Sequence, residues 1–403
     1  MNGADTAFVM VCSALVLVMT PGLAIFYGGL TSSKNVLSTM MHSFFLMSLA
    51  SVIWLVYGYS LSFGPDMGGF IGSLSHFMGA GVGPEVKEGL TIPHTVFLVF
   101  QGMFVIITPA LISGAFAERM KFSSFVIFMI LWITLVYAPI CHWVWGGGWL
   151  SKMGCLDFAG GLVVHLNCGV AALIAALVVG KRKGYGTRPF IPHNLTLTLL
   201  GIGLLWFGWF GFNAGSRLAA DGIAGNAFLV THMAAAMGAL TWLLAEWVAK
   251  SRPTTLGLAS GAVAGLGSIT PACGFVGTGS ALVIGGVAGI ICYFAVLSKE
   301  RLGYDDSLDV VGIHGVGGVW GTMATGLFAS KLINPEGNDG LFYGNYSLLG
   351  VQAVGVLATI VYCAVVTLVI LYVVKAIMGL RVTQEEEDAG VDTAVHGEVG
   401  YNL

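Results

Sequence analysis

The stretch Asp157-Phe-Ala-Gly-Gly-Leu-Val-Val-His165 places an acid, two glycines and a histidine in a segment that is otherwise apolar. A related arrangement occurs later, where Asp306 precedes His314 by the same eight residues. Each histidine lies in a segment long enough to cross a bilayer, and ionisable side chains at that depth are costly and usually functional. The repeated spacing indicates a pore with internal symmetry, in which the two histidines occupy matching places.

The composition of the whole chain is that of an integral membrane protein. Of its 403 residues, 56% are hydrophobic and only 9% are charged, whereas soluble domains carry about 25% charged residues. The net charge of −3 is too small to indicate nucleic acid or another polyanionic partner. The first residues lack the basic region of a signal peptide, so the first apolar run is expected to be a retained span.

The seven cysteines include no Cys-x-x-Cys spacing, which argues against a disulfide framework and against a zinc knuckle. Most of them are expected to be packing residues in apolar segments. Cys141 and Cys155 flank one short loop and could meet there.

Eleven apolar segments approach the length of about 20 residues that a membrane-spanning helix needs. Their centres lie near Leu17, Leu49, Val105, Leu131, Val170, Leu205, Ala236, Val263, Ile290, Val319 and Val365. The predicted fold class is therefore an all-α integral membrane protein with eleven transmembrane helices, embedded in the lipid bilayer.

Lysine and arginine fall unevenly on the two faces that these spans create. Thirteen of the seventeen lie on one face: Lys34, Arg119, Lys121, Lys181, Arg182, Lys183, Arg188, Lys250, Arg252, Lys299, Arg301, Lys375 and Arg381. The other face receives Lys87, Lys152, Arg217 and Lys331. By the positive-inside rule the first face is cytoplasmic, which places the amino terminus outside and the carboxyl terminus inside.

Spans one to five and spans six to ten each make an odd number of crossings, so the second half is expected to be inverted relative to the first. If Asp157 marks the outer entrance of span five and Asp306 the inner entrance of span ten, each histidine lies about 12 Å deep at 1.5 Å per residue. In a hydrocarbon core about 30 Å thick, both histidines then lie near the midplane.

The predicted division of the chain has a transmembrane domain at 1–380 and a cytoplasmic tail at 381–403. Within the first, repeat one covers about 6–180, repeat two about 194–330 and a final long helix about 345–379. The tail contains Glu385-Glu-Glu-Asp388 and is too short for a second domain. It is either a segment that docks a partner or a solvated end.

His165 and His314 are compatible with a metal site, a haem site or a path for protons. A metal needs three or four ligands, and the other candidates lie closer to span ends or in other segments: His42, His94, His142 and His232. A haem normally occupies a spacious pocket, for which there is no separate signal. A proton-competent pore without metal or cofactor fits these residues best, and the alternative is a structural, hydrogen-bonded pair.

Aromatic residues form a second cluster of candidates. Phe100-Gln-Gly-Met-Phe104 lies in the outer half of span three, Trp143 and Trp145 lie at the outer end of span four, and span six contains Trp206, Trp209, Phe210 and Phe212. Most of these are typical of an interfacial belt. A few that faced a common vestibule could hold a small cation, at about 0.5–2 kcal/mol per ring.

Four motifs closely resemble those of the bacterial branch of the ammonium transporter (Amt/Mep/Rh) family. They are Pro21-Gly-Leu-Ala-Ile-Phe-Tyr-Gly-Gly29, Asp157-Phe-Ala-Gly-Gly-Leu-Val-Val-His165, Trp209-Phe-Gly-Phe-Asn-Ala-Gly-Ser216 and Gly312-Ile-His-Gly-Val-Gly-Gly318. The resemblance covers nearly the whole chain. It implies a homotrimer of eleven-span subunits, each with its own narrow hydrophobic pore, in the cell (inner) membrane.

The resemblance also implies a role for particular residues. By position, Phe100, Trp145 and Ser216 match the family's outer recruitment site, and Asp157 matches the acid beneath it. Phe104 and Phe212 match its stacked phenyl gate. His165 and His314 match its twin histidines. Trp145 argues against the Rh branch, which usually lacks a tryptophan there. Asp157 itself is expected to be structural and to cap the start of span five.

A bare ammonium ion pays an idealised penalty of order 20 kcal/mol on entering a low-dielectric pore. Aromatic rings that line the pore do not by themselves offset that penalty. The expected mechanism removes a proton near the outer vestibule, passes neutral ammonia between the rings and returns a proton inside; whether the proton also crosses stays open. We therefore expect an ammonium transporter and no enzymatic activity.

Two alternatives remain from the sequence, an ammonium sensor that controls a partner and a neutral gas channel. A fused kinase or cyclase domain would favour the sensor, and the chain stops at Leu403 without one. The family resemblance also implies a cytoplasmic partner, the PII signal protein, and His396-Gly-Glu398 matches the family's tail there.

Overall fold

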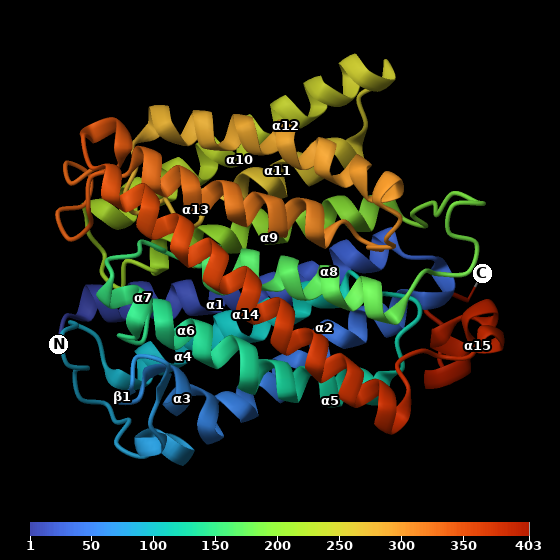
Figure 1. Cartoon of the computed structure of the whole chain (residues 1–403), viewed down its shortest axis with the longest axis horizontal. Coiled ribbons are helices and arrows are strands. Elements are labelled where there is room, and N and C mark those ends of the chain that lie inside the picture. Colours follow the sequence, from blue (N-terminus) through green and yellow to red (C-terminus); the bar gives the residue numbers. More distant parts are fainter. Residues whose placement is uncertain (403) are drawn as a thin grey trace.

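The computed structural model describes residues 1–402 of the chain. It is a bundle of helices whose axes run roughly along the longest dimension of the molecule (Figure 1). The amino terminus and the strand β1 lie at one end of the bundle, and the short carboxyl-terminal helix α15 lies at the other (Figure 1).

The helices account for most of the described chain. They are α1 (Gly3–Leu30), α2 (Val36–Ile53), α3 (Tyr59–Phe63), α4 (His94–Ser113), α5 (Phe122–Trp132), α6 (Ala138–Val144), α7 (Trp149–Lys152), α8 (Asn167–Val179), α9 (Leu195–Gly215), α10 (Gly222–Lys250), α11 (Thr255–Ile269), α12 (Thr278–Leu302), α13 (Val316–Phe328), α14 (Tyr346–Met378) and α15 (Gln384–Ala389). Two very short antiparallel strands, β1 (Asp66–Met67) and β2 (Ile71–Gly72), form a hairpin between α3 and α4.

Shorter helical segments join or extend these elements. The π-helical ones are η2 (Trp54–Gly58), η4 (Ile133–Tyr137), η5 (Gly161–Leu166), η6 (Val311–Gly315) and η8 (Asp392–His396). The 3₁₀ segments are η1 (Ser33–Asn35), η3 (Leu74–Gly79) and η7 (Leu341–Tyr343). Single π-turns inside longer helices often occur at functional sites, and η5 and η6 carry the two histidines singled out above.

Nine helical stretches within residues 1–402 are long and apolar enough to cross a membrane. They are Gly3–Leu30, Ser33–Phe63, His94–Ser113, Phe122–Lys152, Gly161–Val179, Leu195–Gly215, Gly222–Lys250, Thr278–Leu302 and Tyr346–Met378. The other two predicted spans fall on α11, which has 15 residues, and on η6 with α13, which together cover Val311–Phe328. Each predicted span centre thus lies in a helix, and nine of the spans are both long and apolar enough to cross a membrane.

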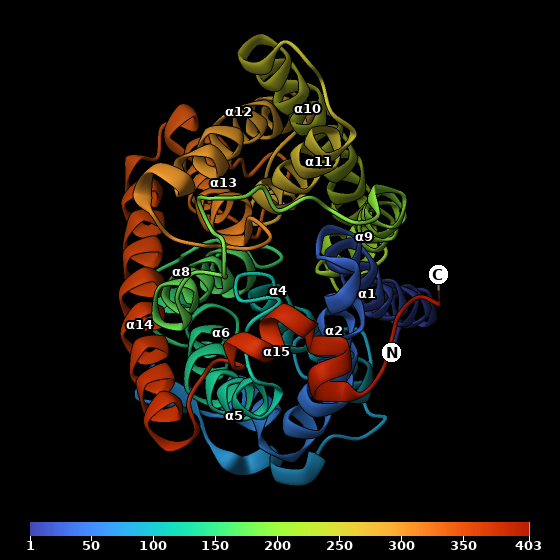
Figure 2. The same ribbon diagram turned by 90° about the vertical axis from the view of Figure 1, so that its right-hand side faces the viewer.

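The helices fall into two groups that α14 joins. Seen along the bundle in Figure 2, α1 to α8 lie mainly on one side and α9 to α13 on the other, with α14 along their common edge. Contacts agree with this view, because α14 packs against α5 and α8 of the first group and α13 of the second. The two groups also contact each other directly, through α1 with α9 and η5 with α13.

Glycine permits the closest approach between the groups. A Cβ atom added to Gly169, in α8, would lie 2.3 Å from the Cα of Gly315, in η6. Any larger side chain at Gly169 would therefore collide with backbone and separate the two segments. The segment α8 begins just after His165, and η6 contains His314. The contact between Gly169 and Gly315 therefore brings the two histidines together.

A buried ion network holds three loops together at the carboxyl-terminal end of the bundle, which we call the basic end. Arg182 donates to Glu118 Oε2 at 2.9 Å and to Asp305 Oδ1 at 2.8 Å, and all three side chains are buried. Burial alone would raise the pKa of Asp305, but the Arg182 guanidinium holds it below its ordinary value. Arg119 adds bonds to the carbonyls of Gly180 and Asp305.

The carboxyl-terminal tail is folded onto the basic end. Of the two alternatives for the tail, a merely solvated end does not describe it, and the docking of a partner stays a prediction. The carboxylate of Asp392 is fully buried and accepts from the backbone N–H of Leu37 at 2.9 Å and of Ser38 at 2.7 Å. It therefore caps the first turn of α2 from 354 residues away. Lys183 pairs with Asp388 in the same tail.

The seven cysteines are all free and buried, which confirms that they are packing residues. The meeting of Cys141 with Cys155 that the short loop allowed does not occur as a disulfide.

Candidate functional site

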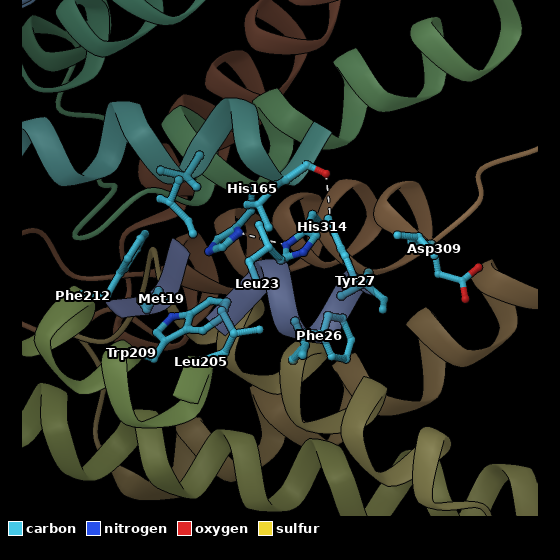
Figure 3. A pocket seen from close by; sticks show the side chains of 16 residues that line it. Met19, Leu23, Phe26, Tyr27, His165, Leu205, Trp209, Phe212, Asp309 and His314 are labelled. Atoms are coloured by element: carbon cyan, nitrogen blue, oxygen red, sulfur yellow. Dashed lines mark hydrogen bonds between the residues drawn. The ribbon is translucent and has the colours of Figure 1, made fainter. Parts of the chain in front are cut away.

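A narrow cavity lies in the middle of the bundle, between the two groups of helices. Figure 3 shows its lining, which runs from Phe212 past Trp209 and His165 to His314, Tyr27 and Asp309. The lining is almost entirely apolar apart from the two imidazoles, the Tyr27 hydroxyl and Asp309. The cavity has a volume of about 20 Å³, which is enough for one water-sized molecule.

The structure brings His165 and His314 into direct contact, as the symmetric spacing predicts. Their Nδ1 atoms are 3.1 Å apart, and their rings are nearly parallel, with an angle of 12° and a centroid distance of 5.2 Å. Because the two Nδ1 atoms face each other, one ring must donate and the other accept. The Nε2 atom of His165 is buried, and no described residue hydrogen-bonds to it.

The Asp157 carboxylate holds the start of η5, the π-helical segment that leads into α8. Its carboxylate accepts from the backbone N–H of Gly160 at 2.8 Å, Gly161 at 2.6 Å, Leu162 at 2.7 Å and Val163 at 3.3 Å. These are the N–H groups that a helix start leaves without partners. The left-handed φ of +123° at Gly160 lets the chain turn beneath the carboxylate. Asp157 therefore has the geometry of a capping residue, with both oxygens engaged.

Asp306 occupies the corresponding place before η6 but is less completely engaged. Its Oδ2 atom accepts from the backbone N–H of Val311 at 2.7 Å. Its Oδ1 atom is buried, and no described residue hydrogen-bonds to it. The two halves thus share an acid before the histidine segment, while the number of bonds that the acid makes differs.

Phe100, Trp145 and Ser216 are grouped around Phe104 and Phe212. Phe100 packs on Phe104 with a centroid distance of 5.1 Å, and Phe104 packs on Trp145 at 5.6 Å. The indole N–H of Trp145 donates to the carbonyl of Asp157 at 2.8 Å. The Ser216 hydroxyl donates to the carbonyl of Phe212 at 2.8 Å, which leaves its oxygen free to accept. All of the predicted outer residues are therefore linked through shared neighbours.

Phe104 and Phe212 separate this outer cluster from the cavity. Their ring centroids are 4.5 Å apart at an angle of 46°, and both side chains are buried. The Phe212 ring also lies 6.1 Å from that of His165. The order along the axis is therefore the outer aromatic cluster, the two phenyl rings and the two histidines.

Two lining residues were given no role in the sequence reasoning. Trp209 stacks on His165 with a centroid distance of 5.4 Å and an angle of 16°. Tyr27 lines the cavity and donates its hydroxyl to the Leu111 carbonyl at 3.1 Å. The signal for Trp209 was its position three residues before Phe212 on one helix, since residues with that spacing share a helix face.

At the basic end the cavity approaches a wider opening of about 210 Å³, lined by residues that include Phe190, Lys299 and Asp309. Lys299 pairs with the Asp309 carboxylate. Within residues 1–402 no group of three or more histidine, cysteine, aspartate or glutamate side chains could hold a metal ion. The narrow cavity and this wider polar opening share Phe26, Leu308, Asp309 and Ile313 as lining residues.

Comparison with known proteins identifies close relatives over the whole length. Residues 7–401 match the model of the family described as Ammonium Transporter Family. An ammonium transporter of Bacillus subtilis is 51% identical over 403 residues, covering 100% of this chain and 99% of the relative. Ammonium transporter Amt1 of Archaeoglobus fulgidus is 45% identical over 401 residues, covering 100% of both chains.

Solved structures with names from the same family have the same fold as this chain. The crystal structure of Candida albicans Mep2 superposes with a TM-score of 0.90 at 38% identity, covering 96% of this chain and 88% of that one. A chain named "Sensor Amt Protein" superposes with a TM-score of 0.90 at 31% identity, covering 97% of this chain and 98% of that one.

Proposed function

Because the chain belongs to the ammonium transporter family, we propose that it takes up ammonium at the outer aromatic cluster and passes it through the histidine-lined cavity as ammonia. The observation that carries this proposal is the pair of contacting, buried imidazoles in an otherwise apolar cavity of about 20 Å³. Such a cavity suits a molecule that is small, neutral and able to form hydrogen bonds.

The recruitment site consists of Phe100, Trp145 and Ser216. Ring faces attract a cation by about 0.5–2 kcal/mol each, and the Ser216 oxygen accepts a hydrogen bond from ammonium. Asp157 acts at a distance, since four backbone N–H groups already occupy its carboxylate. Its roles are to fix the carbonyl that orients Trp145 and to add negative potential below the site.

Ammonium loses a proton before it passes Phe104 and Phe212. The buried rings offer no replacement for the hydration shell, and the idealised cost of moving the ion into such surroundings is of order 20 kcal/mol. Ammonia avoids this cost. The two rings are in contact, so they must move apart for each molecule that passes. Potassium has no proton to lose and is excluded.

His165 and His314 replace water as hydrogen-bonding partners of ammonia in the cavity. His165 Nε2 faces the cavity beside Phe212, where it accepts from or donates to the molecule according to which nitrogen carries the proton. Ammonia regains a proton at the wider opening near Asp309. Transfer of a proton along the bonded imidazoles is a separate route that the pair also permits.

In the membrane, we assign eleven crossings arranged as two inverted repeats, at about 6–180 and 194–330, with the final helix at about 345–379. The basic end faces the cytoplasm of the cell (inner) membrane and the amino terminus lies outside, in agreement with the positive-inside rule. The protein works as a homotrimer, and the cytoplasmic tail predicted at 381–403, which is described and folded over 381–402, is the segment on which a PII-type protein would dock.

The test is to record current and internal pH together in liposomes that contain the protein, after a pulse of ammonium. Coupled transport gives a saturable inward current. Permeation of ammonia alone gives internal alkalinisation without current, which would reduce the protein to a neutral gas channel. If correctly folded protein gives neither a current nor a change of internal pH, the proposal of transport is contradicted.

One observation favours a second candidate, an ammonium sensor that controls a cytoplasmic partner. It is the likeness to the chain named "Sensor Amt Protein", at 31% identity. The same recording separates the two, since a sensor binds ammonium at the outer cluster and gives neither current nor a change of internal pH.

A further inference from the structure

A threonine at the end of α11 holds the ring that stacks on His165. The indole N–H of Trp209 donates to Thr270 Oγ1 at 3.0 Å, and Thr270 Oγ1 donates in turn to the carbonyl of Leu266 at 2.8 Å. Thr270 is fully buried and Trp209 almost so. The hydroxyl therefore makes one bond as acceptor and one as donor, and the indole cannot turn without leaving a buried N–H unpaired.

The same end of α11 also lies close to His165. A Cβ atom added to Gly267 would lie 3.8 Å from the His165 ring. Trp209 covers a face of that ring at 5.4 Å and 16°, while Phe212, one turn further along α9, lies at 6.1 Å. Figure 3 shows Trp209 and Phe212 beside His165 on the side away from Tyr27. The His165 ring thus packs against α9 beside the end of α11, while His314 bonds to its Nδ1 atom.

That orientation decides what each imidazole nitrogen can do. With the ring as it stands, Nδ1 meets His314 at 3.1 Å and Nε2 is left for the cavity. A rotated ring would lose the bond to His314, expose a different nitrogen and open space that water could fill. The indole therefore acts on transport through the imidazole.

We propose that Thr270 is a positioning residue for the transport reaction, which fixes the Trp209 indole and through it the ring orientation of His165. The proposal rests on the proposed ammonium transport. Thr270 itself is not among the residues that line the cavity.

The experiment compares Thr270→Val, which has the same shape without the hydroxyl, with Thr270→Ser, which retains it. We measure ammonium flux and potassium leak in liposomes, and the ring-nitrogen signals of His165 by NMR of the ¹⁵N-histidine-labelled protein in lipid, assigned by their loss in His165→Asn. Thr270→Val is expected to shift the His165 signals, lower ammonium flux roughly tenfold or more and raise potassium leak. Thr270→Ser is expected to restore all three.

Thr322→Val provides a matched control. Thr322 is fully buried, and no described residue hydrogen-bonds to its hydroxyl, so its replacement should leave His165 and flux unchanged. If Thr270→Val does not fold, Trp209→Phe removes the same bond from its donor side while keeping a ring, and the same shift is expected. Unchanged His165 signals in these variants would overturn the proposal. Shifted signals with unaltered flux and selectivity would equally overturn it, because positioning would then not serve transport.

The histidine signals also distinguish this proposal from the function on which it rests. If the unsubstituted protein gave no ammonium flux, the proposed function would fail. The His165 signals of the Thr270 variants would still show whether the threonine positions the ring.

Discussion

His165 and His314 should set both the rate and the selectivity of transport. Replacing either with Asp places an ionisable, acceptor-rich side chain beside a cavity of about 20 Å³, where it draws in water and allows a hydrated cation to pass. Replacing either with Ala removes one hydrogen-bonding partner of ammonia, and a loss of about 1–1.5 kcal/mol corresponds to roughly a tenfold slower flux. We expect the Asp variants to conduct potassium and the Ala variants to lose current without leaking.

Ammonium and potassium currents in liposomes check this expectation. Thermal unfolding of each variant provides the control for folding. Potassium exclusion and ammonium current that both persist in well-folded variants at the two positions would mean that the imidazoles only pack and bond to each other.

Trp145→Leu should weaken ammonium capture but leave the pore open. The substitution removes one ring from the cation site and keeps an apolar side chain, so the half-saturating ammonium concentration should rise by the equivalent of about 0.5–2 kcal/mol. Flux at high ammonium should recover. Trp143→Leu is the matched control, because Trp143 packs on Trp149 and Tyr362 instead. A loss at every concentration would make Trp145 a packing residue.

At the scale of residues, the sequence allows the meeting of His165 and His314 to be predicted because an equal distance from Asp157 and Asp306 places them at equal depth. It does not reveal which nitrogens meet, since that depends on π-turns and on the contact of Gly169 with Gly315. Hydropathy cannot distinguish an indole that faces lipid from one that stacks on an imidazole. Trp209 was therefore missed as a neighbour of His165.

At the scale of helical elements, Asp157 and Asp306 allow a direct comparison of caps. Asp157→Asn replaces one acceptor oxygen by an NH₂ group, which cannot accept from the backbone N–H groups that point at it. Each buried N–H that loses its partner lowers the stability of the fold by about 1–3 kcal/mol. We expect a clear fall in melting temperature and in flux. Asp306→Asn should be milder, because Oδ1 makes no bond with any described residue and the amide can occupy that place.

Thermal unfolding of the two variants, side by side in the same detergent, measures this difference. Equal destabilisation would show that the number of N–H bonds to each carboxylate does not determine the strength of the cap.

The tail is held by a cap on α2 that one substitution can remove. Asp392→Ala deletes the acceptor of the Leu37 and Ser38 N–H groups, and the loss of a helix cap costs about 1 kcal/mol. We expect faster protease cleavage within residues 381–402. Glu385→Ala, at an exposed position of α15, should leave cleavage unchanged. Equal cleavage rates in both variants and the unsubstituted protein would mean that other contacts hold the tail.

Elements were predictable where apolar length alone identifies them. Nine of the predicted spans are long apolar helices. The exceptions are α11, which a loop containing Pro271 follows after 15 residues, and α13, which continues from η6. The folding of the tail was not predictable, since a polar segment rich in glutamate resembles a solvated end. One of its anchors is the buried Asp392, which only the three-dimensional structure places beside α2. Others include the Lys183–Asp388 pair.

At the scale of the whole molecule, charge divides the two ends as the sequence indicates. Lys34, Lys183 and Arg381 lie with the tail at the basic end. Arg217 pairs with Glu336 in a separate set of loops. The pairing of α1 with α9 and the position of α14 across both groups could not be derived from hydropathy, which is blind to the direction that each apolar face takes.

These separate ends lead to a prediction of topology. Cysteine placed at Lys183 and at Glu336 should react with a membrane-impermeant thiol reagent from opposite sides, with Lys183→Cys protected in intact cells and Glu336→Cys labelled. Both positions are exposed, at 48% and 69% of their side-chain surface. The two positions should lie on opposite sides because two inverted repeats and the positive-inside rule require an odd number of membrane crossings between them.

The chain supplies its own control for this experiment. Its seven cysteines are all buried, so the unsubstituted protein should stay unlabelled in intact cells and after gentle permeabilisation. Permeabilisation should then expose Lys183→Cys alone as a new site. Labelling of both substituted positions from the same side would require an even number of crossings between residues 183 and 336. The inverted repeat would then be lost, and with it the argument that Asp157 and Asp306 enter the membrane from opposite faces.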